Sequence, residues 1–252
     1  MQATQAENIN NHFFDGYYKE IWRALIPDGL TTAEVEFLIE KAGLNPGSRV
    51  LDLMCGYGRH TLALARKGIH VTAIDNLKEY VNEVKEVIEK ENLPANCTQI
   101  DVMDYDPVEV FDLVICLGNN LSFFDRADTK QLFSKIGSHT KQGGIFIANS
   151  WTLAEMVFKN FISKIWSKVH DFRYLVDNKF YFNPARIEIE TTIIAANGTE
   201  EIKRAVDYVY SLNEMQTILE ESAFSLTEIW SIPGKKKFML GEPRAYIVAA
   251  KQ

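Results

Sequence analysis

Long hydrophobic runs, paired cysteines and a secretory signal are all missing from this chain of 252 residues. No apolar stretch approaches the roughly 20 residues of a membrane span, and the first residues lack a basic region followed by an apolar core. The three cysteines lie far apart, so they form neither a disulfide framework nor a zinc motif. We therefore expect a soluble, cytoplasmic protein with no bound metal and no membrane partner.

Positive charge is also scarce, since 27 Lys and Arg stand against 34 Asp and Glu, for a formal net charge of −7. This balance argues against a nucleic-acid partner. The composition, 46% hydrophobic and 24% charged, is that of a globular domain able to bury its own core. Because no repeat or low-complexity linker interrupts the chain, we expect a single domain over residues 1–252.

The stretch 50–58, VLDLMCGYG, has the pattern of a buried strand that turns sharply into a helix. Its first residues are strand formers in a run too short for a helix. Gly56 and Gly58 can adopt positive φ and let the backbone approach a bound molecule closely. The next residues, RHTLALARK at 59–67, have apolar side chains at helical spacing. The unit is a strand, a glycine turn and a helix, which together can hold a nucleotide-like ligand.

Strands and helices alternate through the first 150 residues, and two further strands follow near the C-terminus. The strands are expected at 50–53, 70–74, 98–102, 111–117, 145–148, 225–232 and 245–250. Alternation at these intervals predicts an α/β fold with a Rossmann-like, doubly wound, seven-stranded and mostly parallel sheet. Such sheets bind ligands at the carboxyl ends of their strands.

Two segments depart from this alternation. Residues 164–210 contain an alternating strand and an Asn-Gly turn, which predict an inserted antiparallel lid over the ligand edge. Residues 1–30 form an aromatic N-terminal cover, with a helix over 10–25 that closes over either the core or a ligand. Thr31 and Glu34 have the spacing of a capping box at the start of the next helix.

The glycine turn is compatible with two ligand classes, a dinucleotide and S-adenosylmethionine. A dinucleotide site requires a third glycine, and Thr61 occupies that position. Asp52 is badly placed beside a pyrophosphate but suits an amino group. Asp75 and Asp101 end the next two strands, so all three acids line one edge of the sheet. These features favour S-adenosylmethionine, with S-adenosylhomocysteine as the product.

The motifs VLDLMCGYGRHTLALARKG and VTAIDNL resemble the cofactor-binding motifs of the class I S-adenosylmethionine-dependent methyltransferases. The resemblance covers about residues 49–148, and it departs from the family pattern at Met54, where many members have glycine. It implies that the glycine turn lies against the methionine part of the cofactor and that Asp75 binds the ribose hydroxyls. Asp101 would accept from the adenine amino group. The full set of expected cofactor-binding residues is Asp52, Cys55, Gly56, Tyr57, Gly58, Asp75, Asn76, Leu77, Asp101, Val102, Met103, Cys116, Leu117, Gly118, Tyr17 and Trp22.

The loop after the fourth strand, CLGNNLSFF, lies where the methyl group would be presented. It resembles the corresponding loop of the glycine N-methyltransferase type, and the inserted sheet resembles the lid of those enzymes and of amino-sugar N-methyltransferases. The resemblance implies a small-molecule acceptor. An amine nitrogen is expected because it needs only positioning and exclusion of water, with no metal, and the sequence offers no convincing general base. Tyr18, Asn119 and His170 are the candidate catalytic residues.

Several alternatives stay open at this point. One is an O-methyltransferase assisted by a base or a metal, and another is a non-catalytic protein that binds S-adenosylmethionine and interacts with partners. Arg173, Arg186 and Arg204 in the inserted segment can meet a carboxylate, a phosphate or only solvent. Both a monomer and a homodimer are compatible with the sequence.

Overall fold

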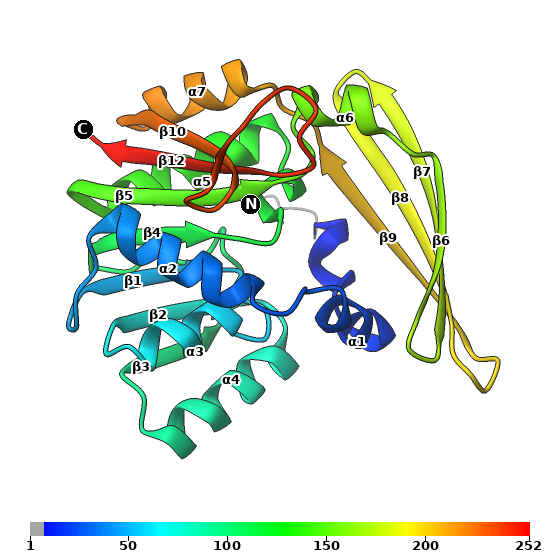
Figure 1. The fold of residues 1–252 in the computed structure, drawn as a ribbon, viewed down its shortest axis with the longest axis horizontal. Helices are drawn as coiled ribbons and strands as arrows, with labels where there is room; N and C mark the ends of the chain where they lie inside the picture. Colours follow the sequence, from blue (N-terminus) through cyan, green and yellow to red (C-terminus); the bar gives the residue numbers. More distant parts are fainter. Residues whose placement is uncertain (1–7) are drawn as a thin grey trace, which may run out of the picture.

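Two sheets make up the protein in the computed structural model, which describes residues 8–252. The central sheet has the strand order β11-β10-β12-β5-β4-β1-β2-β3, and a second sheet has the order β6-β7-β8-β9. Figure 1 shows the second sheet standing across the carboxyl ends of the central parallel strands. The predicted fold class, a doubly wound α/β sheet with a separate antiparallel sheet, is confirmed.

The central strands from β1 to β5 pair in parallel, and β12 joins antiparallel to β5. The sheet has eight strands rather than seven, because a two-residue strand adds to the edge of β10. A strand that short has no alternation to recognise in a sequence. The bounds are β1 (Arg49–Leu53), β2 (His70–Asp75), β3 (Ala95–Gln99), β4 (Phe111–Cys116), β5 (Thr140–Ser150), β10 (Phe224–Ile232), β11 (Lys236–Lys237) and β12 (Ala245–Lys251).

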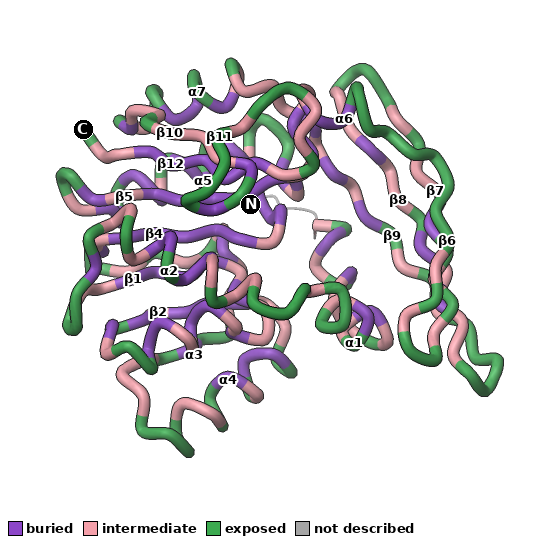
Figure 2. The backbone as a smooth tube through the Cα atoms, viewed as in Figure 1, coloured by how far each residue is buried: buried purple, intermediate pink, exposed green. Residues whose placement is uncertain are grey.

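Helices cover both faces of the central sheet, as the buried character of its strands requires. One face carries α2 (Leu30–Ala42), α3 (Arg59–Ala65) and α4 (Lys78–Glu91), and the other carries α5 (Arg126–His139) and α7 (Leu212–Glu221). Figure 2 shows the central strands buried along most of their length. None of the helices within residues 8–252 has both the length and the apolar composition needed to cross a membrane.

The antiparallel sheet follows α6 (Ala154–Asn160) and falls inside the predicted segment 164–210. Its strands are β6 (Lys164–Val169), β7 (Phe172–Phe182), β8 (Ala185–Ile194) and β9 (Glu200–Tyr208). Alternation gives the sheet a buried and an exposed face: Ile187 and Ala205 are buried, whereas Phe182 is 85% exposed. Figure 2 shows its outer turns exposed to solvent.

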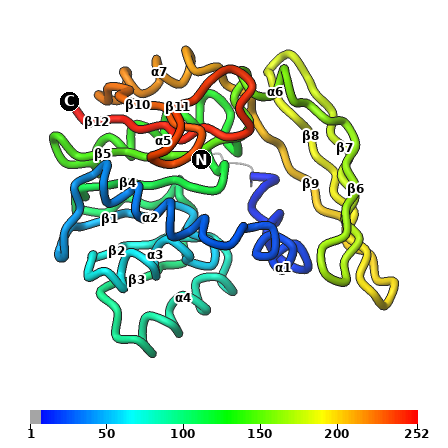
Figure 3. Tube along the Cα trace, in the orientation of Figure 1, coloured from blue at the N-terminus to red at the C-terminus, as the bar shows by residue number. Residues whose placement is uncertain are grey.

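The N-terminal segment forms a 3₁₀ helix, η1 (Ile9–His12), and a separate helix, α1 (Gly16–Ala24). The prediction of one continuous helix over 10–25 is wrong, because Asp15 is extended and Gly16 has φ +58°. Residues 1–7 of the expected cover lie outside the described part of the chain. Figure 3 shows this segment beside β9, although nearly 200 residues separate them in the sequence.

The predicted capping box at the start of α2 is also wrong. The helix begins after Gly29, which is in the left-handed region and makes no side-chain cap. Thr31 and Glu34 instead accept hydrogen bonds from Arg59 on α3. The C-terminal end of α2 at Gly43 agrees with the sequence-based expectation.

Candidate active site

The glycine turn after β1 approaches the carboxyl end of the central sheet. Cys55 N donates to Ile74 O on β2 over 2.9 Å, which holds the turn against the neighbouring strand. Gly56 and Gly58 have φ +56° and +73°, as their sequence pattern predicts. Met54 also has positive φ, +54°, at the position where the resembled family often has glycine. The turn therefore keeps the left-handed conformation at Met54 at a local cost of roughly 1–3 kcal/mol.

The three acids predicted to bind the cofactor lie beside this turn. Asp52 Oδ2 accepts from the Thr61 hydroxyl over 2.6 Å. Asp75 accepts from Gly56 N over 2.8 Å and from Leu77 N over 2.9 Å. Burial raises the pKa of Asp75 to about 6, against the opposing effect of those backbone donors, and it also raises the pKa of Asp52. The third strand spans Ala95–Gln99 rather than the expected 98–102. Asp101 therefore follows β3 by two residues and does not end it.

These residues line a cavity of about 290 Å³, which we call the glycine-turn cavity. Most of the expected cofactor-binding residues lie on its wall. They are Trp22, Asp52, Cys55, Gly56, Tyr57, Asp75, Asn76, Leu77, Asp101, Val102, Met103, Leu117 and Gly118. Three others do not line it: Gly58 caps the start of α3, Cys116 is fully buried at the end of β4, and Tyr17 packs its ring on Phe172.

The basic side chains on the wall of this cavity already have an acidic partner within the protein. Arg59 and His60 both contact the carboxylate of Glu34, His60 Nε2 lying 2.9 Å from Glu34 Oε2. Tyr246 OH donates to the other oxygen of Glu34 over 2.6 Å. The wall thus presents several carboxylates and no uncompensated Arg or His among the described residues. A diphosphate would be repelled here, whereas hydroxyl and amino groups would find acceptors.

A second cavity, of about 360 Å³, lies between the central and antiparallel sheets, and we call it the inter-sheet cavity. Phe14, Trp22, Gly118 and Phe123 line both cavities, so the two spaces adjoin. The wall of the inter-sheet cavity is mainly aromatic and aliphatic. Its aromatic members are Phe13, Phe14, Tyr18, Trp22, Phe123, Trp151, Phe161 and Tyr174.

Asn119 lies where the two cavities meet. Its backbone is in the left-handed region, at φ +67°, and its N–H donates to Asn149 Oδ1 over 3.1 Å. Its side-chain oxygen accepts from Ser150 Oγ, Trp151 N and Thr152 Oγ1, at 2.9–3.1 Å. Because the oxygen is fully engaged, the amide nitrogen must face the other way, toward the antiparallel sheet.

That nitrogen lies 3.2 Å from the carboxylate of Asp207 on β9, which also accepts from Ser122 Oγ over 3.0 Å. Asp207 is 6% exposed, lines the inter-sheet cavity, and has no ion-pair partner within residues 8–252. Burial raises its pKa to about 6, although the two hydrogen bonds oppose that shift. Asp207 is not among the residues predicted from the sequence. The sequence does contain a signal for it. Asp207 lies midway between the apolar Ala205 and Val209 at two-residue spacing, so on an alternating strand all three side chains share one face.

The three candidate catalytic residues are placed differently. Tyr18 and Asn119 both line the inter-sheet cavity. Burial raises the pKa of Tyr18 well above its usual value, and its hydrogen bond with Tyr174 adds to the shift, so its hydroxyl stays protonated near neutral pH. His170 lies in the exposed turn between β6 and β7 and lines neither cavity. The hypothesis that His170 faces a substrate is therefore not supported.

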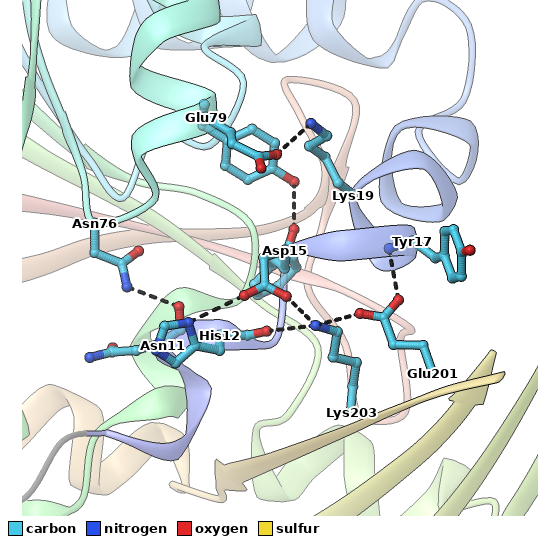
Figure 4. Close-up of polar contacts among 11 residues, drawn as sticks. Asn11, His12, Asp15, Tyr17, Lys19, Asn76, Glu79, Glu201 and Lys203 are labelled. Carbon is cyan, nitrogen blue, oxygen red and sulfur yellow. Dashed lines mark hydrogen bonds and ion pairs between the residues drawn. The ribbon is translucent and has the colours of Figure 1, made fainter. Parts of the chain in front are cut away.

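The N-terminal segment, whose Phe14 and Trp22 line both cavities, connects the central sheet to the antiparallel sheet. Figure 4 shows its polar contacts to both sides. On the central side, Asn76 Nδ2 donates to Asn11 O over 3.0 Å and Lys19 pairs with Glu79 at 2.8 Å. On the antiparallel side, Lys203 of β9 contacts both Asp15 and Glu201. The segment packs Phe13, Tyr18 and Ile21 against the buried face of the antiparallel sheet.

Comparison with known proteins shows what this chain is similar to. Residues 50–144 match the family described as "Methyltransferase domain". Residues 50–144, which include the glycine turn and the acids at 52, 75 and 101, are thus similar to methyltransferase domains. Glycine N-methyltransferase of Rattus norvegicus is 31% identical to it over 163 residues, which cover 56% of this chain and 54% of that protein. The chain thus spans about half the length of the curated relatives it matches.

Solved structures share the fold of the central sheet and of the antiparallel sheet beside it. An S-adenosylmethionine-dependent methyltransferase from Clostridium acetobutylicum superposes with a TM-score of 0.78 at 19% identity, over 93% of this chain and 96% of that one. An amino pentose methyltransferase from Micromonospora echinaspora, solved with bound S-adenosylmethionine, gives a TM-score of 0.72 at 15% identity, over 94% of this chain and 98% of that one. The class I resemblance drawn from the motifs is confirmed.

Proposed function

We propose that the protein is an enzyme that transfers a methyl group from S-adenosylmethionine to an amine nitrogen of a small molecule. The observation that carries this proposal is the junction of the two cavities, whose common wall is formed by Phe14, Trp22, Gly118 and Phe123. A cofactor in the glycine-turn cavity and an acceptor in the inter-sheet cavity would meet at that junction. Transfer in line between two bound groups depends above all on such positioning.

Open space above the glycine turn and the carboxylates on the cavity wall support placing the cofactor in the glycine-turn cavity. A Cβ added at Gly56 would meet no atom within 4 Å, so the space above the turn is open to a ligand. Asp75 is assigned to the ribose hydroxyls, Asp101 to the adenine amino group and Asp52 to the amino group of the methionine part. The cofactor, when bound, would supply an electrophilic methyl group; the amine lone pair would form a C–N bond to its carbon while the electrons of the broken C–S bond stay on sulfur.

Asp207 has two roles in this proposal. Its buried carboxylate attracts the ammonium form of the acceptor into the inter-sheet cavity, where no other ion-pair partner competes among residues 8–252. It then accepts one proton from that ammonium, which leaves a neutral amine with a free lone pair. A carboxyl whose pKa is raised to about 6 is suited to hold a proton near neutral pH.

The other residues at the junction position the acceptor and exclude water. Asn119 fixes the Asp207 carboxylate, and Tyr18, hydrogen-bonded to Tyr174, forms part of the same wall. The aromatic faces attract a methylated ammonium through cation–π interaction. On this proposal residues 1–252 form one methyltransferase domain, in which residues 1–30 are the cover and residues 164–210 are the lid.

Oxygen is the rival acceptor, because Asp207 is also able to accept the proton of a hydroxyl group. A metal-assisted version needs grouped ligands, and within residues 8–252 no three His, Cys, Asp or Glu side chains are close enough to hold an ion. The inter-sheet carboxylate favours the amine, because it supplies the countercharge that an ammonium needs on leaving water.

The test is incubation with S-adenosylmethionine and a panel of amines, phenols and carboxylic acids, followed by mass spectrometry. A gain of one methyl on amines, unchanged by EDTA, is expected. Methylation confined to phenols would replace the nitrogen assignment with oxygen, and restoration by magnesium after EDTA treatment would overturn the metal-independent assignment. Cofactor binding in calorimetry without methylation of any acceptor would favour a non-catalytic binding protein.

A further inference from the structure

The inter-sheet cavity has an unusual charge distribution for a site that takes a small polar metabolite. Among the described residues on its wall, Asp207 carries the one formal charge, and there is no Lys, Arg or His. A ligand with a carboxylate or a phosphate would therefore bring its negative charge next to another one. Burying an unpaired anion costs several kcal/mol or more, so such ligands are disfavoured.

The arginines of the antiparallel sheet do not change this balance. Arg186 pairs with Glu188 at 2.8 Å and stacks on the ring of Tyr181, 4.4 Å from its centroid. Arg204 pairs with Glu190 at 2.9 Å and is largely exposed. Neither of them lines the inter-sheet cavity, and exposed Arg173 does not line it either.

The neutral polar groups on the wall are also partly committed to the protein. Asn160 Nδ2 donates to Gly241 O over 3.2 Å, and Asn178 Nδ2 donates to Ile162 O over 2.9 Å. The hydroxyl of Thr152 donates to Asn119 Oδ1 over 3.0 Å. The hydroxyl of Tyr18 is hydrogen-bonded to Tyr174 on the same wall, so it too is committed to the protein. Most of the remaining wall is aromatic or aliphatic.

We propose that the acceptor is an apolar or aromatic amine that carries no carboxylate, phosphate or other anionic group. This inference rests on the proposed function and narrows its substrate class. The ammonium of the acceptor pairs with Asp207, and its apolar body fills the space between Trp151, Met156 and Ile187. A free amino acid or a phosphorylated amine would place its anion against apolar side chains and is excluded.

The test compares matched ligands that differ only in the anion. Binding of 2-phenylethylamine and of phenylalanine to the protein saturated with S-adenosylhomocysteine is measured by calorimetry. The amine is expected to bind at least tenfold more tightly than the amino acid. Equal binding, or tighter binding of phenylalanine, overturns the inference. If no member of an amine series from methylamine to tryptamine binds, the inference is also overturned.

Variants test whether the Asp207 carboxylate causes the preference for amines without an anionic group. Asp207→Asn should weaken amine binding at least tenfold, and Asp177→Asn, a change on β7 outside the cavity, should leave it unaltered. An unaltered amine affinity in Asp207→Asn contradicts the assignment of the ammonium partner. If Asp207→Asn does not fold, the relative affinities of 2-phenylethylamine and phenylalanine for the unmodified protein still test the inference.

Product analysis distinguishes a failure of the proposed substrate class from a failure of the proposed function. Methylation of both 2-phenylethylamine and phenylalanine at similar rates would leave nitrogen transfer intact and overturn only the substrate class. Methylation of phenols without any amine would remove the proposed function itself. Methylation of phosphoethanolamine in preference to ethanolamine would likewise overturn the exclusion of anions.

Discussion

Asn119 Nδ2 lies 3.2 Å from Asp207 Oδ2, and this contact joins the end of β4 to β9 across the inter-sheet cavity. The amide fixes the direction of the carboxylate but carries no charge that could compensate it. Within residues 8–252, Asp207 therefore remains a buried acid without a compensating cation. Such a residue lowers stability, and its presence beside a cavity is what a binding role would explain.

The Asp207→Asn variant should be more stable than the unmodified protein at neutral and alkaline pH. The folded pKa of about 6 exceeds the ordinary value of 3.8, so the folded state holds the proton more tightly than the unfolded state. The contribution of Asp207 to stability therefore falls as pH rises from about 4 to about 6. The pKa difference is worth about 3 kcal/mol, so after loss of one hydrogen bond worth about 1 kcal/mol the variant should gain about 2 kcal/mol well above pH 6 and lose about 1 kcal/mol near pH 4.

Urea unfolding followed by circular dichroism at several pH values measures this difference. Asp177→Asn serves as the control, because that carboxylate is 42% exposed and its pairing with Lys164 is worth little. A variant that is less stable than the unmodified protein at pH 8 would show that Asp207 has a stabilising partner.

Cofactor affinity should depend on pH through Asp75. The ionised carboxylate is the form that accepts from ribose hydroxyls, and burial raises its pKa to about 6. Affinity should therefore fall as pH drops below about 6, approaching tenfold per pH unit. Asp75→Ala should weaken binding at neutral pH by about 1.5–3 kcal/mol and remove this pH dependence. Calorimetry at two pH values checks both effects, and Asp171→Ala in an exposed turn is the control.

The sequence predicted those parts of the site that depend on short-range patterns. The glycine turn and the acids at 52, 75 and 101 lie at or just beyond the carboxyl ends of strands in a regular alternation, so their common edge can be inferred from the order of strands and helices alone. His170 lies on the inserted segment, but nothing in the residues around it indicates that its turn points to solvent. Which face of a sheet looks inward depends on how the sheet docks, and alternation alone does not determine it.

Asp207 and Glu34 both show that a local sequence pattern does not determine which distant residues a side chain contacts. Asp207 alternates with apolar neighbours, but its partners Ser122 and Asn119 lie more than 80 residues away. Glu34 fits a local capping box, yet three distant donors hold its carboxylate instead, of which Tyr246 is 212 residues away. Long-range packing overrides a local pattern whenever burial supplies better partners.

Glu34→Gln should destabilise the fold by about 3 kcal/mol at neutral pH, because its buried partners Arg59 and His60 would lose their anion. Burial raises the pKa of this carboxyl, but the contacts from His60 and Arg59 outweigh burial and bring it to about 2. The stabilisation is present above the ordinary pKa of 4.5 and is lost as pH falls from there toward 2. Chemical denaturation across that range should show the loss. Glu36→Gln, an exposed change on the same helix, should show none.

Lys203→Met should loosen the N-terminal segment from the antiparallel sheet. Lys203 Nζ contacts Asp15 and lies 2.8 Å from Glu201, so its removal leaves two carboxylates facing each other. We expect faster proteolysis within residues 8–25 and about tenfold weaker acceptor binding, equivalent to about 1.4 kcal/mol. Limited proteolysis with mass spectrometry measures the first effect. Lys164→Met removes an exposed pair and should change neither quantity, and equal proteolysis of both variants would contradict the bridging role.

Gly58 and Gly143 provide a matched pair for the packing beneath the glycine turn. Their φ values are +73° and +74°, so an alanine at either position has the same backbone cost of about 1 kcal/mol. A Cβ at Gly143 meets nothing within 4 Å, whereas at Gly58 it would lie 2.6 Å from Val84 Cγ2 on α4. Gly58→Ala should therefore cost about 1–3 kcal/mol more than Gly143→Ala. Adding Val84→Ala should remove that excess in a double-mutant cycle, because the clash and not the φ angle distinguishes the two sites. Equal destabilisation by the two single changes would mean that α4 moves aside freely.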